Sequence, residues 1–138
     1  MPNVKPAEKN ISITVPLVIA LSRIEDLLTS AFDSMYGGCN YWMSISKVEY
    51  AAGKSKDDYE YPSIQAVLDG GKVTIHDQED NKKLTLTYDK LIKGLEVMAN
   101  LKAGEGGHHF PNFMAENDDA ETADVFVQCC LFGKIVYG

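Results

Sequence analysis

The sequence predicts an α+β fold, with an antiparallel sheet of about four strands, helices packed on one face and a buried C-terminal helix. Several short segments alternate apolar and polar residues, which is typical of strands, while others repeat apolar residues every three and four positions, as helices do. A chain of 138 residues suits one domain with one core. We expect residues 1–9 to form a flexible tail and residues 10–138 to form that domain.

The first predicted strand covers residues 11–21. Every odd position in this segment is apolar, and polar residues or proline fall between several of them. Such a period of two predicts a strand. Because proline cannot donate a backbone hydrogen bond to a neighbouring strand, Pro16 places this strand at a sheet edge or at a bulge.

A helix is predicted to follow directly. Ser22 and Glu25 have the spacing of a capping box, in which each side chain accepts a hydrogen bond from a backbone amide of the first turn. Gly37 could take the left-handed conformation that ends the helix. One apolar stripe runs along this segment, formed by Ile24, Leu27, Leu28, Ala31 and Met35.

The middle of the chain predicts further strands. Residues 41–50 form a second strand whose apolar phase shifts, so we expect a bulge near Ser46 and Lys47. Residues 53–58 read as a polar turn, and residues 59–68 show no clean period and are expected to be extended or irregular. Residues 72–77 and 84–88 alternate well and predict a hairpin.

Two more helices complete the prediction. Asp89 could cap a helix that continues toward Gly104, although Gly94 weakens it by about 1 kcal/mol relative to alanine. A final helix is expected after Asp118 or Asp119, and it is apolar almost all round. Such a helix lies either at the centre of the fold or in a subunit interface, and from its apolarity we expect a homodimer.

Composition limits the classes of function. The formal charge of −7 repels phosphate backbones, so direct nucleic-acid binding is not expected, whereas a basic protein surface would be attracted. No apolar run reaches the roughly 18 residues of a membrane span and no signal peptide is evident, which predicts a cytoplasmic protein. The three cysteines are expected to be reduced, since two of them are adjacent in an apolar segment.

Few residues suggest reactive chemistry. His108 and His109 could ligate a metal or move protons, but no second spaced pair accompanies them, and a solvated loop is the favoured interpretation. The acidic run around Asp118 and Asp119 lacks the order of a calcium loop, and acids are also stabilised at a helix N-terminus. Cys39 has no base near it in sequence. We therefore predict a non-enzymatic protein without a metal or cofactor.

Asn40, Tyr41 and Trp42 form the most suggestive candidate binding site. They follow two glycines in the stretch GGCNYW, at the predicted junction between helix and strand. Aromatic rings with hydrogen-bonding tips are typical of interface anchors and of pockets that stack a base. In the competing interpretation, which is favoured, Trp42 fills the core and Asn40 satisfies backbone groups of the turn.

These segments, taken together, resemble a family of small acidic accessory proteins of bacteriophages and prophages. The resemblance spans about residues 11–138, and its most specific parts are the block HFPNFMAENDDAETADVFVQCCLFGKIVYG and the GGCNYW junction. It carries no catalytic residue over to this chain. It implies a protein that inhibits a bacterial defence component by occupancy, as anti-CRISPR and other counter-defence proteins do.

Contact points can be suggested for this function. Asn40, Tyr41 and Trp42 would anchor the defence protein, and Asp118 and Asp119 would steer it electrostatically. An alternative is an oligomeric sponge for a nucleotide immune signal, in which Tyr41 or Trp42 stacks the base. A third is a small hydrolase that uses His108, His109 and a carboxylate.

Overall fold

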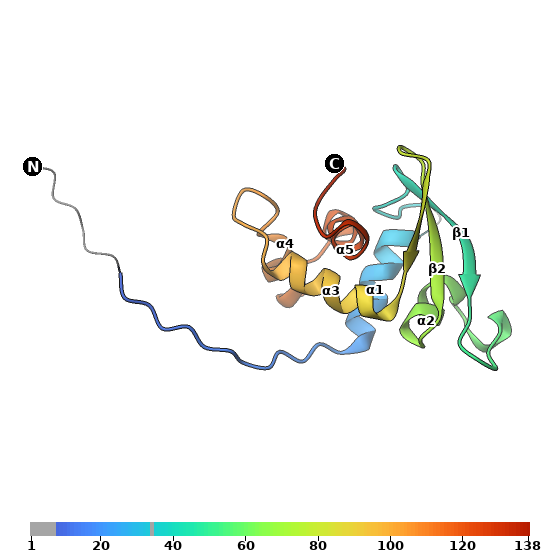
Figure 1. The fold of residues 1–138 in the computed structure, drawn as a ribbon, viewed down its shortest axis with the longest axis horizontal. Coiled ribbons are helices and arrows are strands. Elements are labelled where there is room, and N and C mark those ends of the chain that lie inside the picture. The colour runs from blue at the N-terminus through green and yellow to red at the C-terminus, as the bar shows by residue number, and fades with distance from the viewer. Residues whose placement is uncertain (1–7, 34) are drawn as a thin grey trace, which may run out of the picture.

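The computed structural model describes residues 8–33 and 35–138, and within them the chain forms an α+β domain (Figure 1). The prediction of this fold class is confirmed, with three strands rather than four. Along the chain the elements are α1 (Leu21–Phe32), β1 (Met43–Glu49), a 3₁₀ turn (Lys56–Asp58), α2 (Pro62–Leu68), β2 (Lys72–Asp77), β3 (Lys82–Leu86), α3 (Tyr88–Ala99), α4 (His109–Met114) and α5 (Ala120–Phe132).

The sheet is antiparallel and has the order β1-β2-β3. In the hairpin of β2 and β3, Val73 lies opposite Leu86 and Ile75 opposite Leu84, which confirms the predicted pairing. The register between β1 and β2 shifts between Ile45 and Lys47, at the predicted bulge. Val73 and Ile75 are buried while the residues between and after them are more exposed, so β2 turns one face to the core.

Helix α5 is the buried helix that the sequence predicts. It is buried from Thr122 to Cys130, and it contacts α1, α3, α4 and β3. The side chain of Asp119 caps its first turn, and Gly133 ends it in the left-handed conformation, with φ of 70°. One chain therefore covers this helix by itself, which removes its apolarity as a reason to expect a dimer.

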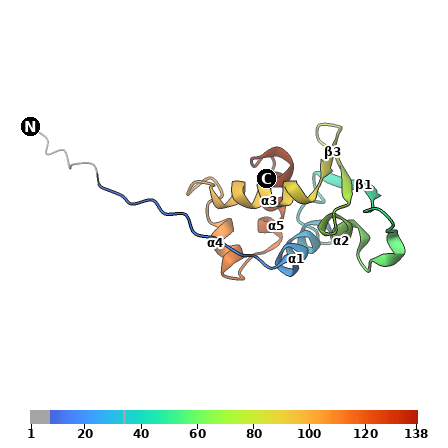
Figure 2. The ribbon, with the colours of Figure 1, turned by 60° about the horizontal axis from the view of Figure 1, so that its bottom comes forward.

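The strand predicted for residues 11–21 is wrong. Residues 9–20 have no regular secondary structure, and Figures 1 and 2 show this segment leading away from the body of the protein. Alternation of apolar residues favours an extended backbone, but a strand also requires a neighbour to pair with, and the segment has none among the described residues. Most of the tail predicted for residues 1–9 lies outside the described residues.

The start of α1 also differs from the prediction. The helix begins at Leu21, and its N-cap is Ala20, whose side chain makes no capping hydrogen bond. Ser22 and Glu25 therefore do not form a capping box. Gly37 lies beyond the end of the helix, and it is required for space instead, because a Cβ there would lie 2.6 Å from the carbonyl oxygens of Ala31 and Asp33.

Residues 59–68 were expected to be irregular, yet they contain α2. Pro62 occupies the first helical position, where its missing N–H group costs nothing. The helix is short, and only Ile64, Ala66 and Val67 are buried, so there are too few apolar residues to show a helical period.

The cap of α3 also differs from the prediction. It is Thr87, whose hydroxyl accepts from the amide of Lys90, and not Asp89.

Gly94 has a packing reason that the sequence does not reveal. A Cβ at this position would lie 2.2 Å from the Sγ atom of Cys130 and 2.8 Å from the Cα atom of that residue. The glycine therefore lets α3 approach α5 closely.

Neither α5 nor any other helix within residues 8–33 and 35–138 is long and apolar enough to cross a membrane.

Candidate functional site

Three residues of the GGCNYW junction make hydrogen bonds to one side chain of α5, Asp124. One carboxyl oxygen of Asp124 accepts from the indole N–H of Trp42 at 2.8 Å and from the amide of Gln128 at 2.9 Å. The other accepts from the hydroxyl of Tyr41 at 2.6 Å. The Sγ atom of Cys39 lies 3.6 Å from the first oxygen. These bonds fix the junction against the central helix and satisfy a carboxyl group that is almost fully buried.

Gln128, one turn further along α5, extends this network to the C-terminal segment. Its carbonyl oxygen accepts from the amides of Val136 at 2.7 Å and Tyr137 at 2.8 Å. Tyr137 in turn donates its hydroxyl to Asp77 on β2 at 2.7 Å, a bond that raises the pKa of the phenol to about 12. Its ring packs 5.3 Å from that of Trp42, so the network joins the junction, α5, the C-terminal segment and the sheet.

Burial makes the thiols of this chain weak nucleophiles. Desolvation, together with the neighbouring Asp124, raises the pKa of Cys39 far above its usual value. Burial also raises the pKa of Cys129, to about 11, and that of Cys130. All three are free cysteines, as the sequence predicts. Because the thiolate is the reactive form, the geometry gives Cys39 a structural role.

The three candidate binding residues of the junction have different positions. Trp42 is fully buried, so its side chain fills the core, as in the interpretation favoured by the sequence. Asn40 is exposed, and its amide donates to the backbone carbonyl of Asp33 at 2.6 Å. Tyr41 keeps 52% of its surface exposed although its hydroxyl is held by Asp124. Only Asn40 and Tyr41 therefore present side-chain area to a partner.

Two further exposed side chains accompany them on the loop between α1 and β1. Met35 and Tyr36 are 77% and 81% exposed, so the expectation that Met35 continues the apolar stripe of the first helix is wrong, because α1 already ends at Phe32. The carboxyl group of Asp33 accepts from both of their backbone amides at 2.9 Å, which lowers the pKa of that carboxyl group. We call Met35, Tyr36, Asn40 and Tyr41 the loop surface.

Asp118 and Asp119 lie at the start of α5, and each already has an internal partner. Asp118 accepts from the guanidinium group of Arg23 at 3.0 Å, and Asp119 accepts from the amide of Thr122 at 2.9 Å. The junction comes close to this segment at Gly38, where a Cβ would meet the carbonyl oxygen of Ala120. The two groups of predicted contact residues are thus brought to the same end of α5.

The solvated loop expected for His108 and His109 is wrong for the second residue. His109 is buried at the start of α4, and its Nδ1 atom lies 3.1 Å from the hydroxyl of Thr122. Desolvation and the adjacent His108 lower the pKa of His109. No group of three or more potential metal ligands occurs within the described ranges. The contact between His109 and Thr122 therefore connects α4 to α5.

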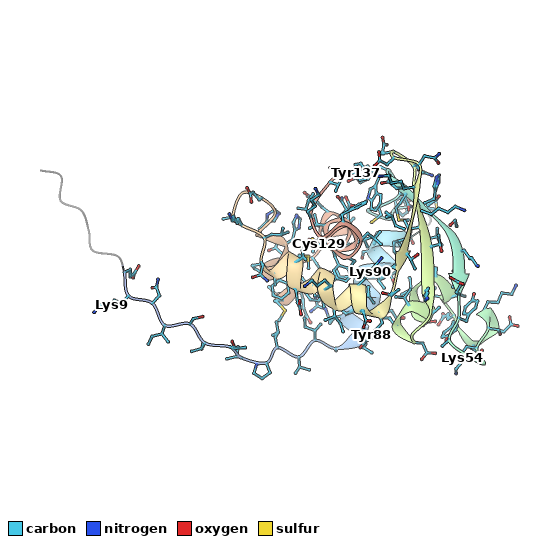
Figure 3. All side chains as sticks on the ribbon, in the orientation of Figure 1. Lys9, Lys54, Tyr88, Lys90, Cys129 and Tyr137 are labelled. Atoms are coloured by element: carbon cyan, nitrogen blue, oxygen red, sulfur yellow. The ribbon has the colours of Figure 1, made fainter. Side chains whose placement is uncertain are left out.

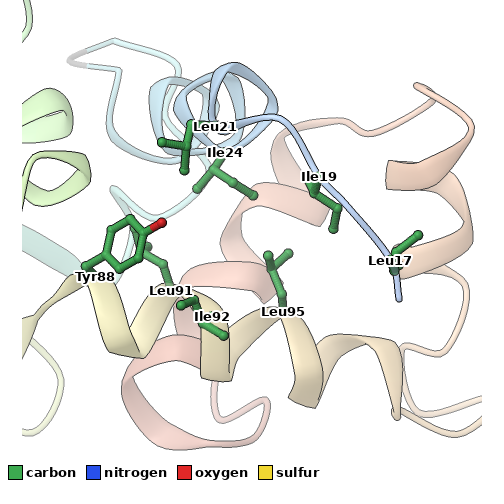
Figure 4. A pocket seen from close by; sticks show the side chains of 8 residues that line it. All are labelled: Leu17, Ile19, Leu21, Ile24, Tyr88, Leu91, Ile92 and Leu95. Carbon is green, nitrogen blue, oxygen red and sulfur yellow. The ribbon is translucent and has the colours of Figure 1, made fainter. Parts of the chain in front are cut away.

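An apolar groove that the sequence analysis missed runs between α3 and the chain before α1 (Figure 4). Figure 4 shows side chains of the two segments facing each other across it. Its volume is about 200 Å³, and a continuation of about 230 Å³ reaches Phe110 on α4. We define the apolar groove by Leu17, Ile19, Leu21, Ile24, Tyr88, Leu91, Ile92 and Leu95.

A signal for the Asp124 network was present in the sequence. Asp124 and Gln128 are separated by one helical turn inside a segment that is otherwise almost wholly apolar. Polar residues in a buried helix require hydrogen-bond partners, which predicts a network without naming its members. The partners come from residues 39–42 and 136–137, and no local pattern connects those segments to α5.

Comparisons of this chain with protein-family models, with curated proteins and with solved structures gave no match. The resemblance to phage accessory proteins thus stays a prediction from the motifs of the chain.

Proposed function

We propose that this protein is a non-enzymatic binding protein that attaches to a bacterial defence protein and disables it by occupancy. The observation that carries the proposal is the loop surface, where large side chains are exposed on a backbone that is held in place. Tyr41 combines both properties, because Asp124 fixes its hydroxyl while half of the residue faces solvent. This arrangement favours a contact site for a protein target.

The chemistry of the loop surface suits protein recognition. Tyrosine and methionine are enriched at the centres of protein interfaces, and tyrosine is frequent among the residues that contribute most to binding. A target that meets a mobile loop must order it, at about 0.5–1.5 kcal/mol for each side chain immobilised. The bonds from Asp33, Asn40 and Asp124 reduce that cost here, because they form within the free protein.

Charge supports a basic target. The chain has a formal charge of −7, and acidic residues gather at the nearby start of α5, where Glu116 has a side chain that is 77% exposed. Complementary charges around an interface raise the association rate and disfavour wrong partners. Asp118 and Asp119 contribute to this field even though their carboxyl groups have internal partners.

The class of target follows from the resemblance to phage accessory proteins. By analogy, small phage accessory proteins without catalytic motifs commonly resemble inhibitors of bacterial defence systems, among them CRISPR systems. A plaque assay on bacterial hosts that carry different defence systems, with and without this gene, tests the class directly. Restored phage growth on one host would identify the system, and no rescue on any host would contradict the proposal.

The loop surface is tested by Tyr36→Ala in the same assay and in capture of the defence protein from a lysate of that host. The substitution should weaken target binding by at least about 30-fold, which corresponds to about 2 kcal/mol for a residue at the centre of an interface. Tyr61→Ala is the matched control. Tyr61 is also an exposed tyrosine, but it follows β1 in the sequence and does not belong to the loop surface, so this variant should bind the target normally.

Two results would favour the alternatives instead. Release of a nucleotide from heat-denatured protein purified from bacteria would support the sponge. Turnover of a small molecule that is lost in His109→Gln, with the fold retained, would support the hydrolase. Either result, together with full target capture by Tyr36→Ala, would remove occupancy through the loop surface.

A further inference from the structure

We infer that the segment before α1 binds a second copy of this chain, so that two such segments pair and cover each other's apolar groove in a symmetric dimer. We call residues 8–20 the arm. Several of its apolar residues are strongly exposed, with 91% for Ile11, 76% for Ile13 and 67% for Val15. Figures 1 and 2 show the arm leading away from the body, and Lys9 lies at its far end in Figure 3.

The arm is unsuited to fold back onto its own body. Ile11, Ile13 and Val15 are β-branched and favour extended backbone, and Val15 is restricted further because it precedes Pro16. The segment also contains no glycine, the residue that most easily adopts the positive φ values of the tightest turns. Leu17 lines the groove, and residues 11–15 lie beyond it on the side away from α1. The chain would need a tight turn before Leu17 to bring them back onto the groove. Another molecule is therefore needed to cover them.

Pro16 determines which edge of the arm can pair. In an extended strand the N–H and C=O groups of alternate residues point to opposite sides. Pro16 has no N–H group, so the edge of the even-numbered residues is interrupted, while the edge of Ile11, Ile13 and Val15 is complete. An antiparallel pair of two arms through this complete edge puts the odd-numbered, apolar side chains of both on one face.

The apolar groove provides a surface for that face. Leu17 and Ile19 line it from the arm, and Ile92, which is 48% exposed, lines it from α3. The continuation toward Phe110 shares these three residues, so the groove is longer than one side chain. Glu96 is the one charged residue that lines either part. An incoming arm would thus place its apolar residues among others of the same kind.

A second copy fits this site better than a different chain. Each copy has one arm and one groove, and a two-fold axis satisfies both at once without leaving a free site. Two chains of charge −7 repel each other, but residues 10–20 carry no charge, so the contact itself adds no repulsion.

The edges of the sheet are protected against the arm. Strand β1 has a bulge and carries Lys47, and strand β3 is short and begins with Lys82 and Lys83. Lys90 also donates to the backbone carbonyl of Thr85 on β3 at 2.6 Å. Lysines, bulges and short strands are the usual means by which an edge resists strand addition. Arm-to-arm pairing therefore remains the favoured mode.

The test is the molar mass of the full chain in solution, measured by sedimentation velocity over a range of concentrations. Wild type should form a dimer. Ile13→Asp should raise the dimer dissociation constant at least about a hundredfold, because the substitution removes two buried side chains from a symmetric dimer. Thr14→Asp is the matched control: it places the same charge on the other face of the arm and should leave the dimer intact.

Two variants test the other elements of the interface. Ile92→Glu should also dissociate the dimer, and circular dichroism should confirm that α3 stays folded, because this residue is half-exposed. Thr14→Pro should retain the dimer, since the amide of Thr14 lies on the edge that Pro16 already interrupts. Loss of the dimer in Thr14→Pro would overturn pairing through the odd-numbered edge.

A monomeric wild type, or an unchanged dimer in both Ile13→Asp and Ile92→Glu, would overturn the inference. In the first case the arm would be assigned to a different partner. The role of the loop surface is tested separately, because Tyr36→Ala should weaken target binding by at least about 30-fold and yet remain a dimer. The two proposals can therefore fail independently.

Discussion

Helix α5 and the arm are both rich in apolar residues, yet they have opposite environments. Helix α5 is buried from Thr122 to Cys130 by elements of its own chain, while Ile11, Ile13 and Val15 of the arm are exposed. The helix satisfies its backbone hydrogen bonds internally and only needs surfaces to pack against, whereas an extended segment also needs a partner for its backbone. Apolar pattern alone thus predicts burial without saying which molecule provides it.

The largest effect on this comparison is expected from the core that surrounds α5. Trp42→Ala should lower the free energy of unfolding by about 3–5 kcal/mol, because it leaves a cavity and removes a donor to Asp124. Urea denaturation followed by circular dichroism measures the change. Trp42→Phe should cost less, since it keeps most of the ring volume. A small change in Trp42→Ala would mean that the core is not organised around this residue.

The next effect concerns the close approach of α3 and α5. Gly94→Ala should destabilise the protein by about 1–3 kcal/mol, although alanine favours an isolated helix, because the added Cβ overlaps Cys130. Thermal unfolding would show the lower midpoint. Lys93→Ala is the control on the exposed side of the same helix. A more stable Gly94→Ala would contradict the close contact between the two helices.

The cap of α5 should contribute less. Asp119→Ala should cost about 0.5–2 kcal/mol near neutral pH, because the amide of Thr122 loses its acceptor. That bond lowers the pKa of Asp119, so its stabilisation is present above the unfolded pKa of about 3.9 and is lost as the pH falls through the lower folded value. The difference between wild type and variant should therefore shrink in acid, while Asp119→Asn should retain most of the cap.

A smaller, pH-dependent effect is expected at His109. Burial lowers its pKa, so the folded state prefers the neutral ring, and stability is lost as the pH falls from the unfolded pKa of about 6.5 through the folded value. His109→Gln should therefore lose less stability than wild type between about pH 7 and about pH 5. Unfolding measured across this range checks the slope. An unchanged dependence of stability on pH would contradict the burial of His109 and favour a solvated loop.

The smallest effect is expected in the arm. Val18→Ser should change the free energy of unfolding by less than about 0.5 kcal/mol, because this residue is 89% exposed and lies on the even-numbered face. The same substitution in the core, Val127→Ser, should be strongly destabilising. A large loss of stability in Val18→Ser would show that the arm packs against the body, and the contrast with α5 would disappear.

The helices and the hairpin could be predicted because their signals are local. The apolar stripe of α1, the alternation in β2 and β3 and the apolar α5 each follow from neighbouring residues in the sequence. The bulge was visible for the same reason, since the apolar phase shifts within β1. Helix α2 was missed because it is only 7 residues long, and Thr87 was missed as a cap because Asp89 has the same chemistry two residues later.

The candidate site was less predictable because its contacts join distant segments. The sequence favoured a buried Trp42, but it could not name the hydrogen-bond partner, Asp124, which lies 82 residues further along the chain. Tyr36 was not predicted as a contact residue because a single aromatic residue forms no pattern in the sequence. Residues 11–21 were predicted to form a strand because their alternation is local, whereas the presence of a neighbouring strand depends on distant parts of the fold.

The position of Trp42 has a practical consequence. It is the one tryptophan of the chain, and it is fully buried beside Asp124. Its fluorescence emission should therefore shift to longer wavelength when the core opens, and should stay constant when two arms associate at the surface. The protein thus contains its own optical probe, with which unfolding can be followed in the presence of self-association.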